Sequence, residues 1–195
     1  MKKLMKIFCL ISIVFCVNLY AQKSKTPSWI LGVGFNAIND SGLSTEGLFN
    51  FSENYNVSRP FKISVEKKLN YRNGIELKAL LNRFKTNKKF NSGFPTEDID
   101  FFAIDFMYKY YLIKNEIDYL SNKRGIALYG TMGPGISFFN DINNVTINLG
   151  TGINYPIAKQ FDINFQVTPK ISVSNKAFSN NYFQFELGVM FYLDK

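Results

Sequence analysis

The stretch YFQFELGVMFYL, residues 182–193, alternates between two kinds of side chain along its whole length. One set is entirely apolar and the other is mixed: Phe183, Phe185, Leu187, Val189, Phe191 and Leu193 against Tyr182, Gln184, Glu186, Gly188, Met190 and Tyr192. Because successive side chains of a β-strand point to opposite faces, the stretch predicts a strand with one apolar face. Such a strand at the edge of a soluble sheet would invite aggregation. As the closing strand of a membrane barrel it has no free edge.

Seven further segments repeat this alternation, at residues 29–38, 60–68, 74–84, 99–113, 125–139, 145–157 and 161–174. Most of them approach or exceed the roughly 9–11 residues that a tilted strand needs to cross a bilayer. After residue 21 no apolar run approaches the roughly 18 residues of a spanning helix. The sequence therefore predicts an all-β fold, an eight-stranded antiparallel up-and-down transmembrane β-barrel, with an even strand number as in bacterial membrane barrels.

Residues 1–21 have the pattern of a secretory signal peptide. Three lysines precede an apolar run from Ile7 to Val17, and a small residue, Ala21, stands before the predicted cut at Gln22. An uncleaved inner-membrane anchor is the alternative. Both cysteines lie within the signal, so the predicted barrel domain, residues 22–195, has no disulfide chemistry. The net charge is +8, part of it from signal lysines, and the basic residues are scattered, which argues against nucleic-acid binding.

The mixed faces indicate which side of the wall points inward. They are rich in glycine, which suits the crowded interior of a narrow barrel. They also carry five lysines and five acids at strand positions: Lys62, Lys68, Lys78, Lys109, Lys170, Glu66, Glu76, Asp105, Asp162 and Glu186. Buried charges persist only when they are paired, so we interpret these ten residues as a polar network across the lumen. The alternative is the solvated outer face of a soluble, lipocalin-like barrel.

Loop lengths and aromatic residues agree with the membrane orientation. With a periplasmic N-terminus, the outer loops are residues 39–59, 85–98, 140–144 and 175–181, and the inner turns are 70–73, 114–124 and 158–160. Membrane barrels keep longer loops outside, although the short third loop and the long second turn are exceptions. Aromatic residues near the periplasmic rim predict an interfacial girdle: Trp29, Tyr110, Tyr111, Tyr155, Phe161, Phe191 and Tyr192.

Several motifs resemble those of OmpA-like outer-membrane proteins, the porin-family barrels. They are a WxxGxGxN strand at residues 29–36, RPFKISVEKKL at 59–69, GIALYGTMGPGISF at 125–138, NLGTGINYPI at 148–157 and FQFELGVMFYL at 183–193. The resemblance implies a barrel in the outer membrane of a Gram-negative cell, inserted by the barrel-assembly machinery. Larger relatives carry a peptidoglycan-binding domain after the barrel. Here the sequence stops, so no cell-wall anchoring is expected.

Catalytic chemistry is not expected. The chain has no histidine, which removes histidine acid–base catalysis, Ser-His triads and the commonest metal ligand. The GVGFNA run at residues 32–37 matches a dinucleotide fingerprint, but it lies inside a predicted strand with no helix to receive a phosphate. Acidic residues in the outer loops form no twelve-residue calcium loop. We therefore expect no enzyme activity, cofactor or metal.

Three functions remain open. The first is a small structural barrel in the outer membrane with a largely plugged polar lumen, which contacts surface partners through loops 39–59 and 85–98. The second is a narrow pore for ions or small solutes, although eight strands leave an interior that side chains nearly fill. The third is a soluble periplasmic binding barrel. The partners expected for the first are outer-membrane lipid and the assembly machinery, with no nucleic acid.

Overall fold

The computed structural model describes residues 29–40, 50–90, 93–113, 117–118, 123–140, 142–173 and 181–193. The predicted signal peptide, with its cleavage site at Ala21 and Gln22, lies outside these residues, as does most of the predicted loop 175–181. No helix among the described residues is long and apolar enough to cross a membrane.

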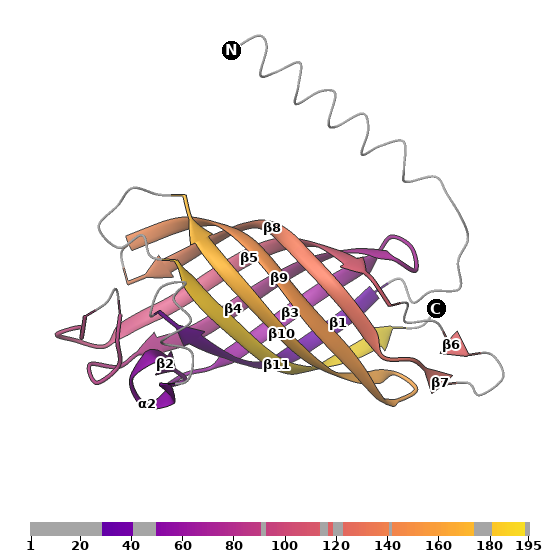
Figure 1. The fold of residues 1–195 in the computed structure, drawn as a ribbon, viewed down its shortest axis with the longest axis horizontal. Coiled ribbons are helices and arrows are strands. Elements are labelled where there is room, and N and C mark those ends of the chain that lie inside the picture. The colour runs from indigo at the N-terminus through magenta and orange to yellow at the C-terminus, as the bar shows by residue number, and fades with distance from the viewer. Residues whose placement is uncertain are drawn as a thin grey trace, which may run out of the picture.

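Eight long strands form a closed antiparallel barrel (Figure 1). They are β1 (Trp29–Asn39), β3 (Phe61–Lys68), β4 (Asn73–Phe84), β5 (Ile99–Tyr111), β8 (Ala127–Phe139), β9 (Ile142–Ala158), β10 (Phe161–Ser172) and β11 (Tyr182–Leu193). Each strand pairs with the next one along the chain, and β11 closes the barrel by pairing with β1 from Trp29↔Leu193 to Asn39↔Phe183. The predicted fold class is confirmed.

Four short elements lie beyond the two rims. Helix α2 (Phe51–Asn54) and strand β2 (Tyr55–Asn56) lie at one end, and strands β6 (Ile117–Asp118) and β7 (Lys123–Arg124) lie at the other (Figure 1). We call the end with α2 and β2 the loop end; residues 85–98 also connect two strands there. We call the end with β6 and β7 the turn end; residues 69–72 and 159–160 connect strands there. The predicted loop 39–59 thus contains structure of its own, and the connection 114–124 includes a small hairpin.

The predicted turn 140–144 is wrong in its length. Strand β9 begins at Ile142, and Asn143 and Asn144 still pair with Phe138 and Ser137 of β8. Only residues 140 and 141 lie between the strands, and Asn140 has a positive φ of 48°. Two-residue hairpins need this left-handed backbone, which asparagine tolerates. Residues 142–144 therefore belong to the start of strand β9 and not to a turn.

The two faces of the wall lie as predicted. Phe35 is 64% exposed on the outside, whereas its neighbour Asn36 is 2% exposed inside. The same alternation runs through every long strand, so apolar side chains cover the outer surface and polar ones fill the interior. This arrangement is the reverse of a soluble barrel with an apolar cavity, and it suits a wall that faces lipid.

A glycine pair lets two strands approach closely inside the barrel. Gly34 of β1 and Gly188 of β11 are register partners. A Cβ atom added to Gly188 would lie 2.6 Å from the Val33 carbonyl oxygen, which is far inside van der Waals contact. Only glycine fits at this seam, as the glycine-rich mixed faces led us to expect.

Candidate functional site: the filled lumen

The first of two ion clusters in the lumen is centred on Glu186 of β11. Its carboxylate oxygens lie 2.5 Å from the Nζ atoms of Lys62 and of Lys78, which come from β3 and β4. Lys78 also lies 3.8 Å from Asp105 of β5, and Asp105 lies 2.7 Å from Lys170 of β10. Five charged side chains from five strands therefore form one continuous chain of opposite charges across the lumen.

The second ion cluster lies closer to the turn end and is centred on Lys109 of β5. Its Nζ atom lies 3.1 Å from a carboxylate oxygen of Glu66 and 3.1 Å from one of Glu76. Lys68 lies 3.7 Å from Glu66, with its Nζ atom 2.9 Å from the ring centroid of Tyr111. The Tyr111 hydroxyl donates a hydrogen bond of 2.8 Å to Glu66. An aromatic ring and three ion pairs thus compensate the charges of this cluster.

The tenth charged residue, Asp162 of β10, accepts a hydrogen bond of 2.6 Å from the Tyr192 hydroxyl. All ten of the residues singled out in the sequence are buried inside the barrel. Removing a charge from water into an apolar interior is expensive, so such residues persist only where partners surround them. Among these ten residues, five are lysines and five are acids.

A layer of apolar side chains closes the lumen at the loop end, and the sequence analysis missed it. Phe84, Phe101 and Phe139 pack together, with ring centroids 5.2–5.9 Å apart, and Tyr182 lies 6.2 Å from Phe101. Phe90, from the connection 85–98, lies 5.0 Å from Phe84. The alternation in the sequence could have predicted this layer, because Phe84, Phe101 and Phe139 stand at inward positions of their strands. Our prediction for that mixed parity concerned only its charged residues and glycines.

Tyrosines occupy the lumen at the turn end, and the predicted girdle is wrong for two of them. Tyr111 and Tyr192 are fully buried inside the barrel, where they hold Glu66 and Asp162. Tyr111 follows outward-facing Tyr110, and Tyr192 follows outward-facing Phe191. Because successive side chains of a strand point to opposite faces, a shift of one position changes the face from outside to inside. Tyr129 packs beside Tyr111 with ring centroids 5.4 Å apart.

Five of the seven predicted interfacial aromatics point outward near the turn end: Trp29, Tyr110, Tyr155, Phe161 and Phe191. The Lys67 ammonium lies 4.6 Å from the Trp29 ring centroid, and Phe191 packs against outward-facing Phe161 with ring centroids 5.0 Å apart. That these residues form an interfacial girdle stays a prediction.

The structure also bears on the metal and nucleotide motifs considered in the sequence. The described residues contain no group of three or more histidine, cysteine, aspartate or glutamate side chains placed to hold a metal ion. The run at residues 32–37 lies within strand β1, as predicted, and not at the start of a helix.

Comparison with solved structures finds the same architecture in outer-membrane proteins. OprG from Pseudomonas aeruginosa superposes with a TM-score of 0.60 at 12% identity, covering 88% of this chain and 98% of OprG. Neisserial surface protein A gives a TM-score of 0.56 at 14% identity, covering 85% and 97%. The N-terminal barrel of P. aeruginosa OprF gives 0.53 at 11%, covering 84% and 97%. The chain has the fold of the eight-stranded outer-membrane barrels. No protein-family model and no curated protein sequence matches it.

At the loop end of this outer-membrane-type barrel, two connections are held together. The backbone N–H of Lys89 donates to the Glu53 carbonyl at 2.8 Å, and the Lys89 ammonium lies 2.9 Å from the Glu53 carboxylate. This side-chain contact lowers the pKa of Glu53 below its ordinary value. The Lys88 ammonium donates to the Ser52 carbonyl. Residues 51–56 and 85–90 therefore form one platform over the aromatic layer.

Proposed function

We propose that this protein is a small barrel of the Gram-negative outer membrane, exported by a cleaved signal peptide, with a structural and surface-contact role. The single observation that carries the proposal is the combination of an apolar outer wall with a lumen filled by ten charged side chains. An eight-stranded barrel has an interior of side-chain dimensions, so such a lumen has no room for a solute. What remains exposed to a partner is the loop end.

The contact surfaces proposed for partners are loops 39–59 and 85–98. Their described parts pack on each other through Glu53 and Lys89, which gives a semi-rigid platform rather than two independent loops. Surface loops on a rigid scaffold are a common place for binding functions. Lipid around the wall and the barrel-assembly machinery complete the proposed partners, and no catalytic activity is proposed.

A narrow pore is the second candidate, and the charged lumen is the observation that favours it. Movement of Phe90 and the aromatic layer beneath it would connect the loop end to the first ion cluster. Ion passage would then require Lys78 and Glu186 to separate, at a large free-energy cost for buried pairs. For this reason we favour the plugged barrel.

Conductance tests the two candidates directly. The full chain is expressed with its signal, purified from the outer-membrane fraction and checked by its faster gel migration before boiling, then added to a planar lipid bilayer. We expect the folded barrel to give no steady open state. A stable, ohmic conductance level would refute the plugged lumen in favour of the pore, and a soluble periplasmic fraction without a gel shift would refute the membrane barrel.

A further inference from the structure

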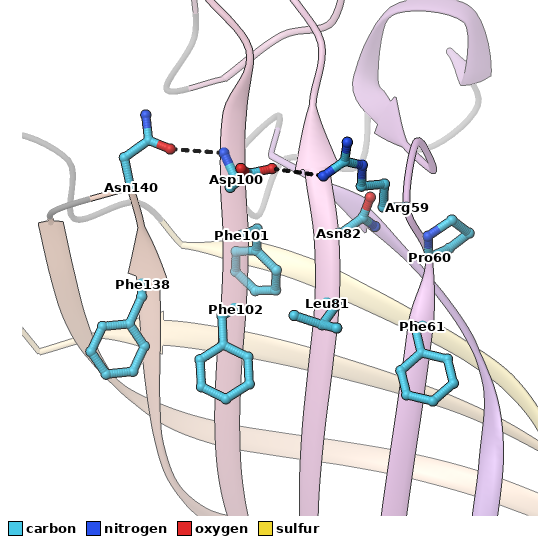
Figure 2. A pocket seen from close by; sticks show the side chains of 10 residues that line it. All are labelled: Arg59, Pro60, Phe61, Leu81, Asn82, Asp100, Phe101, Phe102, Phe138 and Asn140. Carbon is cyan, nitrogen blue, oxygen red and sulfur yellow. Dashed lines mark hydrogen bonds and ion pairs between the residues drawn. The ribbon is translucent and has the colours of Figure 1, made fainter.

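The outer wall carries a depression of about 590 Å³ at the loop end, across strands β3, β4, β5 and β8 (Figure 2). Its lower part is apolar. Phe61, Leu81, Phe102 and Phe138 form one row, because each is the register partner of the next across neighbouring strands. The rings of Phe102 and Phe138 stack with centroids 5.9 Å apart. The row crosses four neighbouring strands on the outer wall, where acyl chains would contact it.

The upper part of the same depression is ionic. Asp100 lies directly above Phe102 on the outward face of β5, and Arg83 of β4 holds it with two hydrogen bonds of 2.6 and 2.9 Å. Asn140 accepts a 2.9 Å hydrogen bond from the Asp100 backbone N–H and so fixes this corner (Figure 2). Arg59 approaches the same carboxylate only to 3.9 Å, and its side chain is 62% exposed.

The charges at this corner are unequal. Two guanidinium groups surround one carboxylate, and the two good hydrogen bonds of that carboxylate go to Arg83. Arg59 therefore presents its donors to the medium above the aromatic row. A guanidinium matches a phosphate through paired, charge-assisted hydrogen bonds, and cations at a membrane interface attract anionic lipids.

A second depression in the wall shows what is special about this one. It is lined by Leu31, Ile63, Leu77 and Ala79 among others, and no ionised side chain points outward among its lining residues. That surface can accept any acyl chain. The depression beside Arg59, in contrast, joins an apolar row to a guanidinium whose contact with Asp100 is a long one of 3.9 Å.

We propose that the groove formed by Arg59 and the row Phe61, Leu81, Phe102 and Phe138 binds one anionic lipid of the outer leaflet, whose phosphate charge is not balanced by a cationic head group as it is in phosphatidylcholine. The acyl chain packs against the row, and the phosphate accepts hydrogen bonds from Arg59. The excess positive charge of the corner is neutralised by the anionic phosphate. The proposal rests on the proposed membrane location, with the loop end facing outward.

Quenching by brominated lipid tests the site at a single position. Trp29 is the only tryptophan and lies at the opposite rim, so the double substitution Trp29→Phe and Phe138→Trp moves the reporter into the groove. The full chain is folded into phosphatidylcholine vesicles that contain phosphatidic acid, with bromine on the acyl chains of one lipid at a time. Bromine on the chain reports acyl contact, so free phosphate gives no signal.

We expect phosphatidic acid to bind beside the indole reporter of this double variant about fivefold or more tightly than phosphatidylcholine, and Arg59→Gln to reduce that ratio to about one. Arg72→Gln removes the same charge from the turn end and is expected to leave the ratio unchanged. If Phe138→Trp fails to fold, Phe102→Trp places the reporter on the same row.

Two failures are distinguishable. A barrel that shows the gel shift in vesicles but has equal quenching by the two lipids, or a preference that survives Arg59→Gln, overturns the lipid site alone. A chain that does not insert into vesicles at all overturns the proposed membrane barrel, and the lipid site with it.

Discussion

Substitution of Glu186 by glutamine removes the carboxylate that two buried lysines share. Lys62 and Lys78 both lie 2.5 Å from it, and their next contacts are longer, 3.4 Å to the Asn164 side chain and 3.8 Å to Asp105. Breaking one buried ion pair from one side costs about 3–5 kcal/mol, because the remaining charge stays buried without its partner. We therefore expect Glu186→Gln to lower the free energy of unfolding by at least about 3 kcal/mol.

The measurement is guanidinium unfolding of the barrel in vesicles, followed by the fluorescence of Trp29 at the turn end. Glu97→Gln makes the same chemical change at an exposed position of the connection 85–98, and we expect its effect to stay within about 0.5 kcal/mol. Lys62→Met combined with Glu186→Gln restores equal numbers of opposite charges in the lumen. This double variant should therefore be more stable than the sum of the two single effects by about 1–3 kcal/mol.

Two results would refute this reasoning. A loss below about 1 kcal/mol for Glu186→Gln would mean that water reaches Lys62 and Lys78, and that the lumen is not filled as described. Strict additivity of Lys62→Met and Glu186→Gln would mean that the two side chains do not share an ion pair in the folded barrel.

Two further predictions concern the wall and the loop end. Leu149→Arg places a charge on the outward face in the middle of β9 and should destabilise the barrel in lipid by about 2–4 kcal/mol. As a control, Asn143→Arg at the rim of the same strand should cost about 0–1 kcal/mol. Equal effects of the two substitutions in the same unfolding assay would contradict the assignment of the outer face. The Lys85 ammonium lies 2.8 Å from Asp98 and lowers the pKa of that carboxyl. The stabilisation by this ion pair is therefore complete above the ordinary pKa of aspartate, and it is lost only as the pH falls through the lowered pKa of the folded state. Carboxyl ¹³C titration should place the Asp98 midpoint below about 3.9, with Lys85→Gln raising it, and an unshifted midpoint would contradict the contact.

Much of the wall could be predicted because strand formation leaves a period of two in the sequence. The stretch 182–193 has the same bounds in the prediction and in β11, and the outward and inward sets agree throughout the long strands. The ends of strands were harder to place. At 140–144 the polar residues of a turn and of an outer strand end look alike, and only the pairing of β8 with β9 separates them.

The sequence also placed ten charges on the inward parity, but it could not assign their partners. Lys78 and Glu186 are 108 residues apart, and they meet because β11 closes on β1 and turns its inward face toward β4. Which lysine meets which acid depends on the stagger between strands, and no local pattern encodes that stagger.

The sequence by itself determined the number of strands and the polarity of the two faces, because both follow from local alternation and from the lengths between turns. Only the tertiary structure decided which of the inward side chains meet inside the barrel. Phe84, Phe101 and Phe139 stand on the inward parity of three strands, and they form a layer only where closure brings those three strand ends to one rim. The groove beside Arg59 has the same origin, since its aromatic row is assembled one residue per strand by the register of four neighbours. Contacts of this kind depend on distances through space between remote segments, and alternation along the chain carries no information about them.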